Sequence, residues 1–288
     1  MRYFIDTEFI EGTQDKTFCG IKIGETKPTI DLISIGIVSE VKKIPDNIKQ
    51  IGLQNGIFTL SEVIKGNTSK EYYAISKEFN LKEAWNRYDK VVNKQYPMGP
   101  KYNKVYWIRD NVLRPVYYEL CQLDNPNLVV DGYNFNFSYK EFKRLLNKYG
   151  KTNKQIAEEV LYFCSNGYFD KTGFDLEQAK QYDLYDKFKP EFYGYYCDYD
   201  WVVFCWLFGK MINLPAGFPM YCIDLKQELD RIAEIKSNEW GTIRNGVNVF
   251  DMQNHIKTLP DYPKQTNEHS AIHDAKYNYE LYKFLQTL

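Results

Sequence analysis

Two acidic residues in the first strand-like run of the chain have the spacing of a metal-binding pair. Asp6 and Glu8 lie two residues apart in RYFIDTEFI, residues 2–10, and side chains two apart in a β-strand project from the same face. Like charges on one face of an apolar strand repel each other and lose hydration unless a cation lies between them. Apolar neighbours on both sides favour a central strand, although an exposed sheet face would accommodate the pair without a cation. The preferred cation for such oxygen ligands is Mg²⁺ or Mn²⁺.

Two further segments could supply more carboxylates to the same site. CDYDWVVF contains Asp198 and Asp200 where a strand meets a helix, a position at which the helix dipole alone favours acids. EHSAIHDA contains Asp274 near the start of the last helix, with His269 five residues before it. Side chains five apart on one helix are about 140° apart, so His269 and Asp274 converge only if His269 precedes the helix. Ser270 as the N-cap would place it there.

The patterns around these residues predict a mixed sheet flanked by helices. Expected strands are residues 2–10, 29–40, 71–76, 191–197 and 219–225, and expected helices are 153–164, 198–212, a helix after 225 and the C-terminal segment. The first three strands, joined by turn-rich connections, predict an antiparallel meander. Residues 81–146 have a helical pattern that breaks at 96–103, and 165–190 is expected to be a connector. Strands and helices then alternate, which is typical of a mixed sheet.

The composition is that of a globular protein with many aromatic residues. Lys and Arg number 37 against 38 Asp and Glu, which gives a net charge of −1 and excludes a polybasic arm as the main binding device. The 44% hydrophobic content is enough to bury a core. No run of 18 apolar residues occurs and no signal segment begins the chain, so we expect a cytoplasmic protein with no membrane partner. The six cysteines form no C-x-x-C pair and are expected to be buried free thiols.

The order of the acidic motifs resembles that of the DEDDh 3′–5′ exonucleases of the RNase T-like group. D-x-E in a first strand precedes LISIG in the next, Tyr199-Asp200 follows a later strand, and H-x-x-x-x-D ends at Asp274. The segments RYFIDTEFIE, DLISIGIVSE and EHSAIHDAKYN are most similar to the branch with the mycobacterial adenine-preferring exoribonuclease and its phage and bacterial relatives. The last motif alone is a weak signal, whereas three motifs in order on the expected elements are a strong one.

The resemblance implies a fold and a domain organisation. The implied fold is ribonuclease H-like, α/β, with a mixed five-stranded sheet in which an antiparallel meander is followed by parallel strands, flanked by helices. One domain is expected to span residues 1–288, with a core at 1–76 and 190–288 and a helical and loop insertion at about 77–189. Related enzymes are often homodimers, which makes a homodimer the implied assembly, in a bacterium or a phage-infected bacterial host.

The resemblance also implies a catalytic site. Its four metal-binding carboxylates are Asp6, Glu8, Asp200 and Asp274, holding two Mg²⁺ or Mn²⁺ ions, and its general base is His269. Asp200 is preferred to Asp198 because an aromatic residue directly precedes the aspartate of the family's second motif; Asp198 remains the alternative. His273 does not have the family offset and is read as a structural residue. The implied reaction is two-metal hydrolysis of phosphodiester bonds from the 3′ end of single-stranded nucleic acid, which releases 5′-nucleoside monophosphates.

A near-neutral chain is expected to hold a single strand partly by stacking on aromatic residues. Candidate substrate-binding residues are Thr7 and Phe9 beside the acid pair, Trp201 after Asp200, and Trp240 in the loop-like NEWGTIRNG. Core packing explains Trp201 at least as well, because it begins the apolar run WVVFCWLF. The implied partner is the 3′ end of single-stranded RNA, with DNA as the alternative substrate. A small-nucleotide phosphohydrolase and a non-catalytic nucleic-acid-binding module are the competing hypotheses.

Overall fold

The computed structural model describes the chain except for residues 20, 41–70, 94–100, 129–135, 165–188 and 245–248. The described chain divides into two compact units. Unit 1 comprises Met1–Asp6, Gly36–Tyr73 and Lys154–Leu288, and unit 2 comprises Thr7–Ile35 and Ala74–Asn153. The predicted arrangement of a core and an insertion within one domain stays a prediction.

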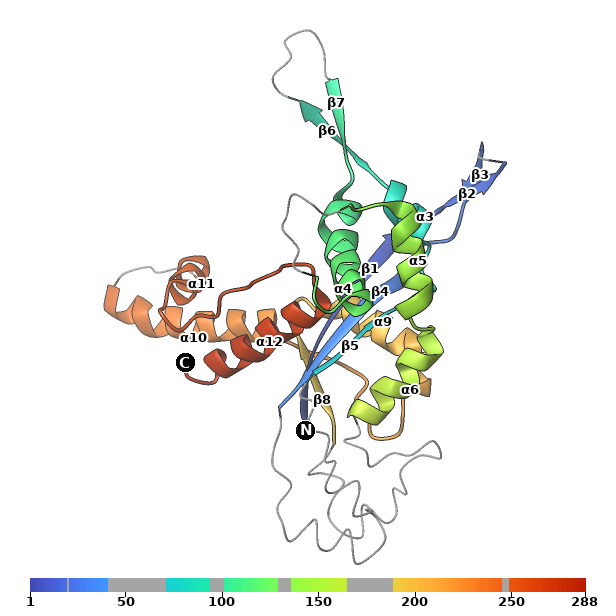
Figure 1. Ribbon diagram of the computed structural model, residues 1–288. Coiled ribbons are helices and arrows are strands. Elements are labelled where there is room, and N and C mark those ends of the chain that lie inside the picture. The colour runs from blue at the N-terminus through green and yellow to red at the C-terminus, as the bar shows by residue number, and fades with distance from the viewer. Residues whose placement is uncertain (20, 41–70, 94–100, 129–135, 165–188, 245–248) are drawn as a thin grey trace, which may run out of the picture. The chain divides into compact units, whose positions relative to one another are not determined.

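A mixed five-stranded sheet has the strand with the acid pair at its centre (Figure 1). Its strands are β1 (Arg2–Gly12), β4 (Thr29–Ser39), β5 (Glu71–Ile75), β8 (Glu191–Gly194) and β9 (Ile223–Asp224), in the order β5-β4-β1-β8-β9. β8 pairs in parallel with both β1 and β9, and the sheet also contains antiparallel pairing. The expectation of a mixed five-stranded α/β sheet is confirmed. Because β1 is the middle strand, its side chains face packed layers rather than an open edge.

Helices and aromatic side chains pack the core of unit 1. Its helices are α6 (Asn153–Cys164), α9 (Asp198–Leu207), α10 (Leu225–Arg244), α11 (Val249–Lys257) and α12 (Ala271–Leu285), with a short 3₁₀ turn, η2 (Met211–Asn213). Phe4 is fully buried, and its ring centroid lies 5.4 Å from that of Tyr193, 5.0 Å from Tyr279 and 5.2 Å from Tyr282. Such tilted and offset ring pairs add stability beyond the area they bury. Much of the aromatic excess in this unit is therefore core packing.

The N-terminal turn of α12 lies unusually close to the sheet. Gly36 in β4 faces this turn, and a Cβ atom added there would lie 2.2 Å from the backbone oxygen of Ala271. One turn further along the helix, the buried Asn278 donates from Nδ2 to the backbone oxygen of Ile5 at 2.9 Å. Gly36, which has no side chain, lets α12 approach β4 closely, and the buried amide of Asn278 bonds the helix to β1.

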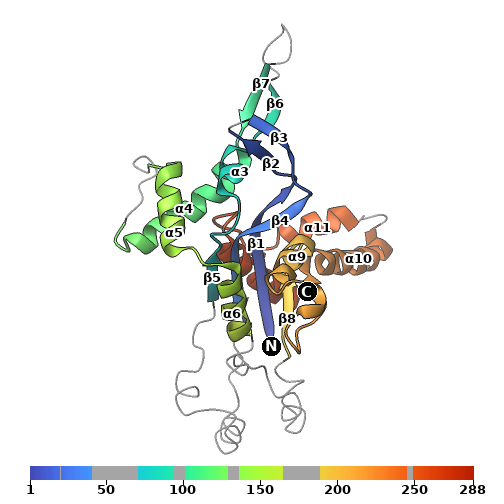
Figure 2. The ribbon, with the colours of Figure 1, turned by 90° about the vertical axis from the view of Figure 1, so that its right-hand side faces the viewer.

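Unit 2 contains two hairpins that the sequence patterns did not predict (Figure 2). One pairs β2 (Asp15–Phe18) with β3 (Ile21–Glu25), and the other pairs β6 (Asp89–Asn93) with β7 (Lys101–Val105). The helices of this unit are α3 (Leu81–Asn86), the π-helical turn η1 (Ile108–Leu113), α4 (Arg114–Asp124) and α5 (Tyr139–Tyr149). The β2–β3 hairpin continues beyond the ends of β1 and β4, and the β6–β7 hairpin projects between α3 and η1, each as a two-stranded arm (Figures 1 and 2).

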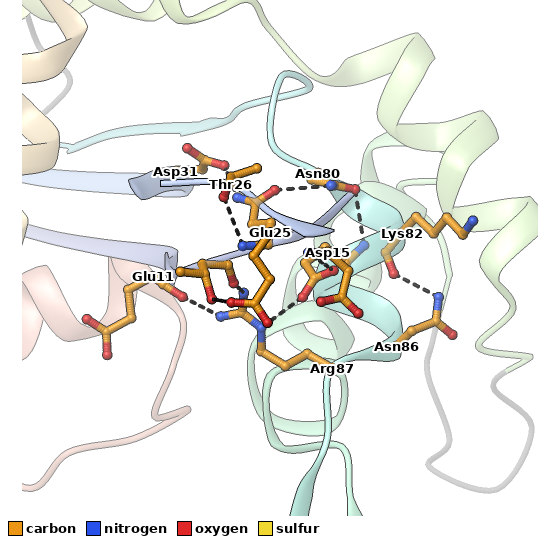
Figure 3. Close-up of polar contacts among 12 residues, drawn as sticks. Glu11, Asp15, Glu25, Thr26, Asp31, Asn80, Lys82, Asn86 and Arg87 are labelled. Atoms are coloured by element: carbon orange, nitrogen blue, oxygen red, sulfur yellow. Dashed lines mark hydrogen bonds and ion pairs between the residues drawn. The ribbon is translucent and has the colours of Figure 1, made fainter. Parts of the chain in front are cut away.

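A polar network joins the base of the β2–β3 arm to α3 (Figure 3). The buried Gln14 accepts from Asn80 Nδ2 at 3.1 Å and donates from Nε2 to Asp31. Arg87 donates to the backbone oxygens of Glu11 and Thr13, the latter at 2.8 Å. Because these groups satisfy both main-chain and side-chain atoms, the base of the arm is held by hydrogen bonds rather than by apolar packing.

Several element boundaries differ from the expected ones. β8 ends at Gly194 and β9 covers only Ile223–Asp224, while α9 ends at Leu207. The helix stops there because Gly209, with φ of 97°, adopts the left-handed conformation that favours glycine. Trp240 lies within α10 and not in a loop. The expected connector 165–190 falls almost entirely outside the described residues.

The cysteines and the lengths of the apolar helices bear on two of the expectations. All six cysteines are free, but only Cys164, Cys197 and Cys205 are buried, so the expectation of buried thiols holds for three of them. Among the described residues, no helix combines the length and the apolar character needed to cross a bilayer.

We expect Gly36→Ala to destabilise the protein because the new methyl group would press against the backbone of Ala271. Overpacking of this kind costs about 1–3 kcal/mol of unfolding free energy, which urea denaturation would measure. Ser34→Ala is the matched control in the same strand, because Ser34 is buried and its hydroxyl has no partner among the described residues. A Gly36→Ala variant as stable as Ser34→Ala would contradict the close docking of α12.

Candidate metal centre

Three carboxylates from opposite ends of the chain meet beside the central strand. Asp6, Glu8 and Asp274 each offer an oxygen atom, and these atoms all lie within 4.8 Å of one another. Glu8 and Asp274 are buried, at 8% and 7% exposure, and Asp6 is half-buried. An exposed sheet face, the alternative explanation of the D-x-E pair, does not describe these residues. The group can hold a metal ion.

The position of each acid follows from its element. Asp6 and Glu8 share a face of β1, as their spacing predicted, and Ile5 immediately before them accepts the hydrogen bond from Asn278. Asp274 precedes Asn278 by four residues on α12, so both side chains lie on the same helix face. Asn278, which bonds to the backbone of β1, therefore lies one helical turn after Asp274 on α12.

The turn before α12 holds Asp274 through its backbone. Ser270 is the N-cap, which confirms that His269 precedes the helix. The backbone N–H of His269 donates to Oδ2 of Asp274 at 2.9 Å, and Nε2 of Gln265 donates to Oδ1 at 2.6 Å. His269 itself adopts a left-handed backbone conformation, with φ of 65°. A non-glycine residue in that region costs of order 1 kcal/mol and persists only where the surroundings impose it.

His273 helps to maintain the same turn. Its Nδ1 lies 3.0 Å from Oγ of Ser270, and its Nε2 lies 3.3 Å from Nδ2 of Asn267, which also has a positive φ of 53°. The backbone N–H of Ser270 in turn donates to the backbone oxygen of Asn267 at 3.2 Å. These contacts agree with the structural role that the sequence suggested for His273.

Charge repulsion makes this arrangement costly without a cation. Burial raises the pKa of the Asp274 carboxyl, although hydrogen bonds from Gln265 and from the His269 backbone lower it. Two full negative charges that lie within 4.8 Å of each other repel by at least about 3 kcal/mol at an effective dielectric constant of about 20. Oxygen ligands on opposite sides of a Mg²⁺ ion are about 4 Å apart, and of a Ca²⁺ ion about 5 Å apart. The spread of the three acids thus matches one hard divalent cation.

Asp200 is buried in the first turn of α9, whereas Asp198 in the same turn is exposed. Among the described residues, Asp200 is not a member of the group whose oxygen atoms all lie within 4.8 Å. The two segments nevertheless follow neighbouring parallel strands. Pairing of β1 with β8 ends at Phe4 and Tyr193, so Asp6 and α9 both come after the carboxyl end of the paired region. Ligands of open α/β sheets commonly bind at that edge.

The candidate substrate-binding residues differ in their surroundings. Thr7 is buried and Phe9 is half-buried in β1, next to the acid pair. Trp201 is buried and stacks on Phe204, with centroids 4.8 Å apart and planes at 10°, as a core aromatic does. The side chain of Trp240 lies outside the described part of the chain. Contact of any of these residues with a substrate stays a prediction.

Sequence reasoning missed three residues that build the centre. Gln265 has no motif to mark it, because a glutamine in a polar loop is common. Asn278 lies on the inward face of an amphipathic helix, where a polar residue is unusual, and that position is a usable signal. Gly36 lies in the middle of an apolar strand, where glycine often marks a close approach of another backbone.

Comparison with known proteins adds no assignment. No protein-family model matches the chain, and the search of curated proteins found no match. The inference about function therefore depends on the residues and their geometry.

We expect Mg²⁺ or Mn²⁺ to raise the thermal unfolding temperature of the protein, because a ligand of the folded state at 100 times its Kd adds about 2.7 kcal/mol. Glu8→Gln should raise the unfolding temperature of the EDTA-treated protein, since one repelling charge is gone, and should reduce the rise that the cation causes. Differential scanning calorimetry measures both. Asp198→Asn is the matched control and should respond to the cation as wild type does; a wild-type response from Glu8→Gln would rule out this centre.

Proposed function

We propose that the protein is a metal-dependent 3′–5′ exonuclease that acts on single-stranded nucleic acid, with RNA as the preferred substrate. The observation that carries the proposal is the meeting of Asp6 and Glu8 in the central strand with Asp274 in the first turn of the last helix. A D-x-E pair and an H-x-x-x-x-D motif are each common by chance. Their convergence into one buried acidic group is what a phosphoryl-transfer site of the DEDDh type requires.

Features of the fold support the proposal. A mixed sheet in the order β5-β4-β1-β8-β9, with the D-x-E strand in the middle, is compatible with a ribonuclease H-like fold. Asp200 is the proposed fourth carboxylate, and its burial favours it over the exposed Asp198, because a buried carboxylate requires a partner.

Each residue has a distinct proposed role in hydrolysis. Asp6, Glu8, Asp200 and Asp274 would hold two Mg²⁺ or Mn²⁺ ions, which when bound would activate a water molecule and neutralise charge on the scissile phosphate. His269 takes a proton from that water at a ring nitrogen. The water oxygen bonds to phosphorus while the bond to the 3′ oxygen of the preceding nucleotide breaks. That oxygen gains a proton, and a 5′-nucleoside monophosphate leaves.

The backbone contact between His269 and Asp274 gives this proposal a specific geometry. The residue that supplies the base also donates its N–H to Oδ2 of the metal-binding acid. The left-handed backbone at His269 therefore fixes the start of the base's side chain relative to that carboxylate. Such preorganisation reduces the reorganisation needed when the substrate binds.

Purified protein incubated with a 5′-labelled single-stranded oligonucleotide and Mg²⁺ or Mn²⁺ should produce a ladder of shortened products that EDTA abolishes. RNA and DNA of the same sequence, each labelled at the 5′ or the 3′ end, report the sugar preference and the direction of degradation. Metal-dependent hydrolysis confined to dinucleotides or free nucleotides would instead identify a small-nucleotide phosphohydrolase. Binding without any product would identify a non-catalytic module.

We expect His269→Ala to lower kcat by about 100-fold or more, the usual contribution of a general base, while the cation still raises the unfolding temperature. Asp200→Asn should lower both activity and cation binding, and Asp198→Asn should lower neither. Rates of product formation at saturating cation, measured beside calorimetry on the same samples, separate the two effects. Full activity in His269→Ala would refute its assignment as the base, and an inactive Asp198→Asn with an active Asp200→Asn would reverse the choice of aspartate.

A further inference from the structure

One face of the β6–β7 arm carries tyrosines and lysines in alternation. Lys90 of β6 pairs directly with Lys104 of β7, and Tyr102, two residues before Lys104, pairs with Val92. Because side chains alternate with a period of two, these three residues share one face. Tyr88 and Tyr106, two residues from the lysines in the other direction, continue the same series. This face, defined by Tyr88, Lys90, Tyr102, Lys104 and Tyr106, is called the arm face below.

The rings and cations of the arm face are already in contact. Nζ of Lys104 lies 4.2 Å from the ring centroid of Tyr88, and the rings of Tyr88 and Tyr106 are 5.8 Å apart. Cζ of Arg109 lies 3.9 Å from the ring centroid of Tyr106. Tyr102 is 55% exposed, so its ring remains accessible. Cation–π contacts hold the lysine ammonium and the arginine guanidinium beside flat surfaces. Arg109 is also ion-paired with Asp110 at 3.1 Å, whereas Lys104 is not paired in this way with any described residue.

The lysine pair has no acidic partner among the described residues. Like charges directly opposite each other on two strands destabilise the pairing. In the part of the chain that the structure describes, no carboxylate lies within ion-pair distance of Lys90 or Lys104, and the adjacent Asp89 belongs to the opposite face by its register. The β2–β3 arm of the same unit differs, because its Lys22 pairs with Asp15 at 2.6 Å and with Glu25 at 2.7 Å.

We propose that the arm face binds single-stranded nucleic acid, with phosphates at Lys90 and Lys104 and bases stacked on the tyrosines. Positive charge without an acidic partner among the described residues favours an anionic ligand. Flat rings beside these charges favour a ligand that offers planar groups between its own charges. A single strand presents phosphates and bases in that alternation, and stacking tolerates any base. The choice of nucleic acid over an acidic peptide also rests on the proposed nuclease function.

Fluorescence anisotropy of a 5′-labelled, unstructured 12-nucleotide RNA in EDTA measures this surface without hydrolysis. The double variant Tyr102→Ala/Lys104→Ala should bind at least about 5-fold more weakly than wild type, since loss of one stacked base alone corresponds to that factor or more. Lys104→Gln alone should reduce the slope of log affinity against log salt concentration by about one. The matched control is Phe18→Ala/Lys22→Ala on the β2–β3 arm, which also removes one exposed ring and one lysine and should bind within 2-fold of wild type.

Circular dichroism confirms that each variant is folded before binding is compared. Equal affinity of the arm-face double variant and wild type would overturn the proposal, as would an equal loss in both double variants. Competition by polyglutamate as strong as competition by unlabelled RNA would identify an acidic protein partner instead. A change in sedimentation of the arm-face variant, with unchanged RNA binding, would identify an interface between copies of the chain. Because binding is read in EDTA, failure of the nuclease assay leaves this outcome unaffected.

Discussion

The candidate metal centre depends on how closely the first turn of α12 docks against the sheet. Gly36 leaves no side chain in the way of the Ala271 backbone, and Asn278 bonds directly to the Ile5 oxygen. Asp6 follows Ile5 immediately, and Asp274 lies one turn before Asn278. The separation of the acids is consequently set by backbone contacts of a strand and a helix rather than by flexible loops. A site held in this way needs little rearrangement to receive a cation.

This docking is maintained against the repulsion of the acids that it brings together. Burial of Asp274 raises its pKa, which is the usual response of a carboxylate removed from water near other acids. The opposing stabilisation comes from the aromatic core around Phe4, whose ring lies near those of Tyr193, Tyr279 and Tyr282. A strained backbone and repelling carboxylates, held in place by a well-packed core beside them, are typical of a functional site. A core of this kind also explains why a chain with so many aromatic residues does not need them all for binding.

The part of the site that local rules govern could be predicted from the sequence. A period of two placed Asp6 and Glu8 on one face, and N-cap chemistry at Ser270 placed His269 outside the last helix. Contacts between distant segments could not be predicted, because nothing near Gln265 or Gly36 in the sequence names the partner that each one meets. The strand order was likewise expected only as a mixed sheet, and the ribonuclease H-like assignment remains a proposal.

The two arms were missed for a different physical reason. Neither arm buries a face, because Phe18, Ile21 and Ile23 are all exposed on one arm and Tyr102 is exposed on the other. Each strand has only four or five residues, which is too short for a pattern such as Ile21-Lys22-Ile23 to identify it. The net charge of −1 conceals the difference between the arms, because it sums an ion-paired Lys22 with Lys90 and Lys104, which have no acidic partner in the described part of the chain. Register and ion pairing, which only the folded chain supplies, distinguish a surface whose charges are already neutralised from one that can still attract an anion.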